Sequence, residues 1–408
     1  MQEPAGVQEE TTMVSETSST RRIAALSAAA GSIFAYFQRS AWSEQAKDPD
    51  ACDFAFGNPH DMPIPAYVEA LREAAIPHDP AWFAYKFSEP YAQETVSTSL
   101  RNRFGLPFEP DDIAMTTGGF AALFVTLTAL IEPGDEVIFA LPPWFFYEIG
   151  VVHNSGVPVK VRVDPVTFDL DLAAIEAAIT PRTRLVLINT PCNPTGKIYS
   201  PETLKGLADL LEAASRRNGR TIYLLSDEAY NHYVYDGATF HTPLEFYPES
   251  LLAYSYGKTL LAPGQRIGYL ALSPSMANRE QLRQDIFIAQ MANAFAFPNA
   301  VLQRAVPEIE LLSIDIGRME RKRDRMVSAL REIGYDVHSP EGAFYLFPKS
   351  PLSDDWAFVE MLEERKVFCH PGALSEWPGH FRISLTASEE MIERSLPIFA
   401  DVLAATRA

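Results

Sequence analysis

Residues 251–269 read LLAYSYGKTLLAPGQRIGY, and this stretch decides how the rest of the sequence is interpreted. The apolar run from Leu251 to Ser255 is typical of a buried β-strand, and it leads directly into Gly257 and Lys258. Arg266 follows eight residues after the lysine. A lysine amine can form a Schiff base, and an arginine beside small hydroxyl residues can bind a phosphate. Because a single lysine is usually a surface residue, the other parts of the chain must show whether these groups form a site.

Short apolar segments alternate with helical patterns on both sides of this stretch, which predicts a sheet covered by helices. Ligands bind such a sheet at the carboxyl ends of its strands, and Asp227 and Lys258 both follow strand candidates. The predicted strands are 112–117, 136–140, 157–163, 184–189, 221–226 and 251–255. The predicted fold class is therefore α/β, with a mostly parallel sheet sandwiched by helices in a large domain and a smaller α+β domain.

The sequence predicts three structural parts. Residues 1–50 are expected to form an N-terminal arm, polar and mobile over the first twenty residues and followed by an amphipathic helix from Ile23 to Phe37. This helix is expected to clasp a partner subunit, to cover the site or to dock on its own small domain, and the sequence leaves these alternatives open. Residues 80–300 are the predicted large domain. Residues 51–79 and 301–408 are the predicted small domain, because a long helix ending near Arg331 precedes short strands around 342–347 and 381–385. The helix after Arg21-Arg22 is too short for a membrane span, so no membrane partner is expected.

Composition and charge narrow the classes of partner. The chain has 408 residues, 47% of them hydrophobic, which is enough for a large core. Its 53 acidic and 34 basic residues give a net charge of -19, which makes nucleic acid an unfavourable partner. The three cysteines, Cys52, Cys192 and Cys369, have no CxxC spacing, so neither a disulfide framework nor a metal site is expected. A reducing, cytoplasmic location fits this pattern best.

Several short motifs agree in order and spacing from Phe54 to the C-terminus. They are Gly57-Asn58-Pro59, Thr117-Gly118-Gly119-Phe120, Pro143-Trp144, Asn193-Pro194-Thr195-Gly196, Asp227-Glu228-Ala229-Tyr230, Ser255-Tyr256-Gly257-Lys258, Arg266 and Phe381-Arg382-Ile383-Ser384. With these motifs the chain resembles the fold-type I aminotransferases of class I/II, which depend on pyridoxal 5'-phosphate. The resemblance implies that cofactor, an amino acid and a 2-oxo acid as substrates, and a homodimer with active sites at the subunit interface.

The catalytic roles fall on three of these residues. Lys258 is expected to form the Schiff base with the cofactor and, once free, to move the proton from the substrate's Cα. Asp227, at the end of a buried strand, is suited to pair with the pyridine nitrogen of the cofactor. Tyr230 and Asn193 are expected to hydrogen-bond the phenolic oxygen of the cofactor.

The phosphate site is predicted at the start of a helix. Gly118, Gly119 and Phe120 follow a strand and open an apolar helix, where free backbone N–H groups and the helix dipole favour an anion. Ser255 and Arg266 are expected to complete this site. A single aromatic ring is expected to stack against the cofactor, and by resemblance this residue is Trp144.

The α-carboxylate of the substrate is expected to bind Arg382, whose planar guanidinium can make two parallel hydrogen bonds. Gly57, through its backbone, and Asn193 are expected to complete that carboxylate site. By resemblance, a tyrosine from the partner subunit reaches the phosphate. Tyr91 has the usual spacing for this contact, with Tyr85 as a rival.

The motifs leave the reaction and the side-chain specificity open. Transamination is the favoured function, and the alternative is a lyase, cyclase or replacement enzyme that uses the same Schiff base. A non-enzymatic regulator is least favoured, since the catalytic residues are all present. A second cation for a dicarboxylate substrate cannot be assigned. Aromatic residues near Trp144 and Gly57 indicate either an apolar substrate pocket or plain core, namely Phe54, Phe56, Phe145, Phe146 and Tyr147.

Overall fold

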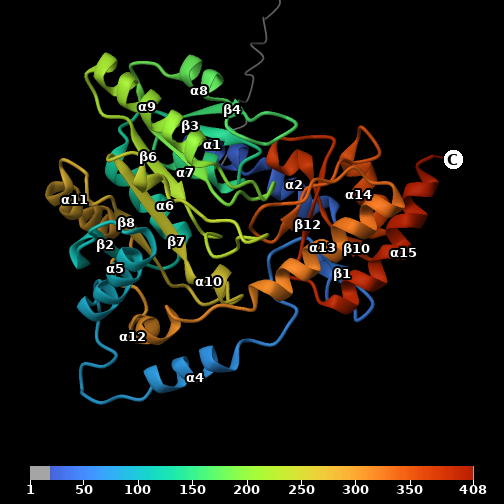
Figure 1. Cartoon of the computed structure of the whole chain (residues 1–408), viewed down its shortest axis with the longest axis horizontal. Helices are drawn as coiled ribbons and strands as arrows, with labels where there is room; N and C mark the ends of the chain where they lie inside the picture. The colour runs from blue at the N-terminus through green and yellow to red at the C-terminus, as the bar shows by residue number, and fades with distance from the viewer. Residues whose placement is uncertain (1–18, 408) are drawn as a thin grey trace, which may run out of the picture.

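The computed structural model describes residues 19–407, and a seven-stranded sheet is its largest element (Figure 1). The strand order is β2-β8-β7-β6-β5-β3-β4. All neighbouring strands are parallel except that β8 runs antiparallel to both β2 and β7. The strands are β2 (Ile113–Thr116), β3 (Glu136–Leu141), β4 (Val157–Arg162), β5 (Thr183–Asn189), β6 (Tyr223–Asp227), β7 (Ser250–Ser255) and β8 (Gly268–Leu272).

Helices cover both faces of this sheet. Along β7, Leu251 and Ala253 belong to one apolar cluster while Leu252 and Tyr254 belong to another, as expected when alternate side chains point to opposite faces. The helices of this part are α4 (Pro65–Ala74), α5 (Pro90–Phe104), α6 (Gly119–Leu130), α7 (Phe146–His153), α8 (Leu172–Ala178), α9 (Pro201–Asn218), α10 (Tyr256–Thr259), α11 (Arg279–Ala292) and α12 (Ala300–Ile309). The predicted helix-sandwiched, mostly parallel sheet is confirmed.

A smaller α+β part contains two short sheets. One is antiparallel with the order β11-β12-β9, and the other is the parallel pair β1-β10. Its strands are β1 (Cys52–Asp53), β9 (Tyr345–Leu346), β10 (Val367–Phe368), β11 (His370–Pro371) and β12 (Phe381–Ser384). Its helices are α13 (Ile316–Ile333), α14 (Asp355–Glu363) and α15 (Glu389–Ala405). Short 3₁₀ turns are η1 (Pro110–Asp112), η2 (Pro243–Glu245) and η3 (Gly372–Ser375).

The packing differs from the predicted parts in two places. Helices α4 and α12 contribute to the same apolar cluster as α5, β2 and β8. Helix α4 packs on α12 and α12 on α5, so 65–74 and 301–309 lie with the large part of the fold rather than with the predicted small domain. The cause is their apolar faces, which include the buried residues Tyr67 and Val306. Elsewhere, the boundaries 1–50, 51–79, 80–300 and 301–408 remain a prediction.

The N-terminal helix predicted from Ile23 to Phe37 is two helices. They are α1 (Arg21–Ala29) and α2 (Gly31–Arg39), and the short α3 (Trp42–Gln45) follows them. The chain leaves helical geometry at Ala30, just before Gly31, and glycine is a poor residue for a helix interior. Helix α1 packs on α7 and α2 on η3. Nearly all of the polar arm predicted over the first twenty residues lies outside the described residues.

Two features are absent from residues 19–407. None of the helices in that range is long and apolar enough to cross a membrane. Nowhere in the same range do three or more His, Cys, Asp or Glu side chains come together as a metal site would require.

Candidate active site

A cavity of about 450 Å³ lies at the carboxyl ends of β6 and β7. That volume is within the range of small-molecule sites. The strands of a parallel sheet end on one side, so residues far apart in sequence meet there. The predicted site residues that line the cavity are Gly57, Gly119, Phe120, Trp144, Asn193, Asp227, Tyr230, Ser255, Lys258, Arg266 and Arg382.

Lys258 and Asp227 enter the cavity from adjacent strands. Asp227 is the last residue of β6, and Lys258 lies in α10, the single turn that follows β7. The lysine is half-buried, with Nζ 5.6 Å from the centroid of the Tyr230 ring and 5.9 Å from that of Phe344. A primary amine and a carboxylate therefore face one small enclosed space.

Asp227 is held in place by its neighbours. Tyr147 donates a hydrogen bond from its hydroxyl to Asp227 Oδ2 at 2.7 Å, and the backbone N–H of Ala229 donates to Oδ1 at 3.2 Å. Burial raises the pKa of Asp227, while these two hydrogen bonds and Lys258 act in the opposite direction. The carboxylate is thus oriented by donors whose own positions the fold fixes.

Tyr230 forms the wall of the cavity beside Lys258. Its hydroxyl is hydrogen-bonded to that of Tyr345 at 3.3 Å, and burial raises its pKa well above the usual value. Tyr345 also lies under Arg382, whose guanidinium carbon is 4.4 Å from the ring centroid. The structure thus adds Tyr345, from β9, to the residues predicted from the sequence.

Gly118, the α6 N-terminus and Arg266 form a cradle suited to an anion. Gly118 has φ +90°, and a Cβ there would lie 2.7 Å from Nη2 of Arg266, so only glycine fits this position. Among the described residues Arg266 forms no ion pair, and its Nη1 donates to the backbone carbonyl of Pro263 at 2.8 Å. The protein around Arg266 lowers its pKa by desolvation. Ser255, the residue before α10, lines the same end of the cavity.

Arg382 is a buried cation whose five N–H donors are not all used within the described chain. It is 5% exposed, and it donates to Asn193 Oδ1 at 3.0 Å, to the carbonyl of Ala55 at 2.6 Å and to His370 Nδ1 at 2.7 Å. Its Nε is buried and has no partner within the described chain. Burial and the adjacent Arg382 hold the pKa of His370 well below its usual range. A buried guanidinium facing a cavity in this way is suited to a carboxylate.

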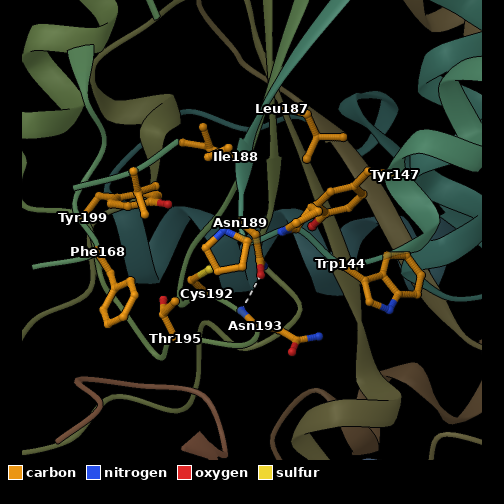
Figure 2. Close-up of a pocket in the computed structure, with 14 residues that line it drawn as sticks. Trp144, Tyr147, Phe168, Leu187, Ile188, Asn189, Cys192, Asn193, Thr195 and Tyr199 are labelled. Atoms are coloured by element: carbon orange, nitrogen blue, oxygen red, sulfur yellow. Dashed lines mark hydrogen bonds between the residues drawn. The ribbon is translucent and has the colours of Figure 1, made fainter. Parts of the chain in front are cut away.

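A small internal cavity behind the site shows how Asn193 and Trp144 are placed (Figure 2). It has a volume of only about 10 Å³, room for no more than one water molecule. Asn189, the last residue of β5, accepts a hydrogen bond from the backbone N–H of Asn193 at 2.7 Å. Tyr147 lies in the wall of this small cavity, and Trp144 belongs to both cavities.

Tyr91 and Tyr85 lie away from the cavity. Tyr91 is half-buried at the start of α5, with its hydroxyl enclosed and its ring centroid 5.5 Å from the guanidinium carbon of Arg304. Tyr85 is 87% exposed. The role predicted for Tyr91, with Tyr85 as its rival, concerns a partner subunit, and it stays a prediction.

The aromatic residues that the sequence assigns either to a substrate pocket or to plain core divide into two groups. Phe56, Phe145 and Phe146 line the cavity. Phe54 is fully buried in the core of the smaller part, and Tyr147 faces Asp227 instead. Ile33 and Phe37 of α2 also line the cavity, and the sequence alone did not assign them to it. Their signal was the helical spacing of the N-terminal apolar residues, which fits any docked helix equally well.

Comparison with known proteins gives one consistent result. A family model described as aminotransferase class I and II matches residues 49–397. An aspartate/prephenate aminotransferase from Thermus thermophilus is 33% identical over 354 residues, covering 84% of this chain and 89% of its own. A probable aspartate aminotransferase from Methanocaldococcus jannaschii is 28% identical, covering 86% and 93%.

Solved structures agree with this result. The chain is similar to an amino transferase from Eubacterium rectale, with a TM-score of 0.85, 30% identity and coverage of 93% of this chain and 96% of the other. It is also similar to an aspartate aminotransferase from Thermotoga maritima, with a TM-score of 0.80, 26% identity and coverage of 95% and 100%.

Proposed function

Because the chain belongs to the class I and II aminotransferases, which depend on pyridoxal phosphate, we propose that the cavity described above is where it transfers an amino group between an amino acid and a 2-oxo acid. The observation that carries this proposal is that Lys258, Asp227 and Arg266 line one cavity. They bring together an amine, a carboxylate and a guanidinium that has no ion-pair partner in the described chain. Elimination and cyclisation are not favoured, since the relatives reported above are named as aminotransferases.

The residues of the cavity fit the cofactor. Arg266 and the free N–H groups at the start of α6 would hold its phosphate, together with Ser255 and the residues Gly118, Gly119 and Phe120. Asp227 would pair with its ring nitrogen, and Tyr230 and Asn193 would hydrogen-bond its phenolic oxygen. Trp144 would stack against the ring.

The chain's own groups then supply binding and proton transfer. When bound, pyridoxal phosphate withdraws electrons from the substrate's Cα, so that its proton becomes acidic. Lys258 would hold the cofactor through its amine and, when that amine is free, take the proton from the substrate's Cα and carry it to the C4′ carbon of the cofactor. Arg382, with Asn193 and the backbone of Gly57, would fix the α-carboxylate and so orient the Cα–H bond toward Lys258.

A homodimer is part of the proposal. Exposed aromatic side chains gather on the surface formed by the 83–87 segment, α11 and the segment that follows α11, which indicates an interaction surface. Phe87 lies 5.0 Å from both Phe287 and Phe297, and Tyr85 lies 5.1 Å from Phe297, as ring centroids. A second copy of the chain would cover this surface. The exposure of Tyr85 supports it, rather than Tyr91, as the residue that reaches a partner's phosphate.

We also propose a cytoplasmic location for the protein. Cys52, Cys192 and Cys369 are buried free thiols, which is compatible with a reducing compartment.

One experiment separates transamination from its alternative. The holoenzyme is mixed with a panel of amino acids and no 2-oxo acid acceptor, and products and cofactor spectrum are followed. We expect one 2-oxo acid released per active site, with the amino group kept by the cofactor. Repeated turnover that releases ammonia or a thiol would contradict the proposal and support elimination.

A further inference from the structure

Part of the cavity lining is an apolar wall built from three separate segments. Ile33 and Phe37 come from α2, and Phe56 comes from the segment after β1. The Phe37 and Phe56 rings are stacked, with centroids 5.7 Å apart and an interplanar angle of 11°. Phe145 and Phe146, the N-cap and the first residue of α7, line the same cavity, with centroids 4.8 Å apart. We call these five residues the apolar wall.

The N-terminal part of this wall is anchored to the fold. Tyr36 of α2 is fully buried, and its ring centroid lies 4.6 Å from that of His370. Arg39, at the end of the helix, pairs with Glu360 of α14 at 2.6 Å. His370 in turn accepts a hydrogen bond from Arg382. The apolar wall therefore stands at a fixed place relative to the residue proposed for the α-carboxylate.

The charges that line the cavity are all accounted for. Three cations line it, Lys258, Arg266 and Arg382, and the proposed function uses each of them. No fourth cationic side chain lines the cavity within residues 19–407. Within this chain, a second carboxylate on the substrate would thus meet aromatic rings, without the ion pair that a buried charge requires.

We propose that the enzyme prefers amino acids with an aromatic or large aliphatic side chain over dicarboxylic amino acids. This inference rests on the proposed function, since it places the substrate's α-carboxylate on Arg382 and its side chain against the apolar wall. Several relatives reported above carry aspartate in their names. The lining of this chain's cavity supports a different choice.

The test uses carboxylates without an amine, so that binding is measured apart from catalysis. Holoenzyme is titrated with 3-phenylpropanoate and with succinate by isothermal calorimetry. We expect 3-phenylpropanoate to bind at least about tenfold more tightly, because an apolar pocket gains from the ring and rejects an unpaired charge. Succinate binding as tightly as 3-phenylpropanoate, or more tightly, would overturn the inference.

A matched pair of variants on α2 locates the effect. Phe37→Ala removes a ring of the apolar wall and should weaken 3-phenylpropanoate binding by roughly fivefold while changing succinate little. Phe34→Ala also removes an exposed ring of α2, since Phe34 is 52% exposed and Phe37 is 44% exposed. Phe34 does not line the cavity, so this variant should leave both affinities unchanged. Equal losses in the two variants would contradict the assignment.

Failure of this inference and failure of the proposed function are distinguishable. If no amino acid donates its amine to a 2-oxo acid, the proposed function fails, whichever carboxylate binds. If amine transfer occurs but dicarboxylic substrates are preferred, only the specificity inference fails.

Discussion

The two ends of the cavity are built in different ways. At the cofactor end, Asp227, Ser255 and Lys258 stand at the ends of neighbouring strands of one sheet, and each oxygen of the Asp227 carboxylate has a defined donor. The apolar wall instead collects side chains from α2, from the segment after β1 and from the start of α7. Chemistry that depends on one atom should tolerate few substitutions, whereas apolar surface should tolerate swaps that keep its volume.

Arg382→Ala should give the largest loss among the predictions that follow. The change removes a buried guanidinium with three hydrogen bonds, and we expect kcat/KM to fall roughly 100- to 1000-fold. Arg382→Lys should recover little of this, because an ammonium cannot make two parallel bonds. Steady-state kinetics check both. The control is Arg365→Ala, which breaks an exposed ion pair with Asp401.

Activity near that of the unmodified enzyme in Arg382→Ala would remove Arg382 from the carboxylate site. It would also weaken the contrast between the two ends of the cavity.

Glu228 gives the cofactor end a pH dependence that the apolar wall lacks. Burial raises the pKa of Glu228 to about 7, from an ordinary value of 4.5, although Thr242 and Asn231 donate hydrogen bonds to it. The folded protein therefore holds a proton that the unfolded chain has lost. The stability linked to this proton is present below pH 4.5 and is lost as the pH rises to about 7.

In Glu228→Gln this loss should disappear. The free energy of unfolding of the apo-protein is measured with urea at about pH 5 and about pH 8. Between these two pH values it should fall in the unmodified protein by up to about 3 kcal/mol more than in the variant. The comparison uses only the difference between the two pH values, so a constant cost of the substitution cancels. Equal pH dependence in both proteins would contradict the assignment.

Tyr147→Phe should have a smaller effect, because it removes one hydrogen bond to Asp227. We expect kcat to fall about tenfold and cofactor affinity to weaken, since the carboxylate loses an orienting donor. Tyr199→Phe is the matched control, as Tyr199 is a buried tyrosine in the wall of the same small cavity and does not contact Asp227. Similar losses in both variants would mean that packing, and not the Asp227 contact, is responsible.

Ile33→Leu should have the smallest effect. It keeps the volume of the apolar wall, so kcat/KM for an aromatic amino acid should change less than about threefold. Ile33→Glu should reduce it far more, because it places a charge against the substrate side chain. A large loss in Ile33→Leu would show that the apolar wall also depends on exact contacts, and the contrast between the two ends would disappear.

The sequence predicted the cofactor end better than the apolar wall. Strand ends and the glycine pair before α6 are local patterns, and the six predicted strands are present as β2 to β7 with ends shifted by at most two residues. Strand β8 was not among the predicted strands, and it runs antiparallel to its neighbours. Residues that follow successive parallel strands must come together, which is why Asp227 and Lys258 could be paired without a structure.

Contacts between distant segments could not be predicted in this way. Tyr147 donates to a carboxylate 80 residues later, and nothing in its own surroundings distinguishes it from Phe146. The spacing of Ile33 and Phe37 indicates only a docked helix. The sequence predicts a single helix there, whereas the structure has a break just before Gly31. Which element covers an apolar face depends on tertiary packing.

The most direct test of the role proposed for Lys258 is to identify the lysine that carries the cofactor. The purified holoenzyme is reduced with borohydride and digested, and the peptide bearing the pyridoxyl phosphate group is found by mass spectrometry. We expect modification at Lys258, and no modified peptide from Lys258→Ala. Modification of another lysine, such as Lys197, or of none in protein that contains the cofactor would contradict it.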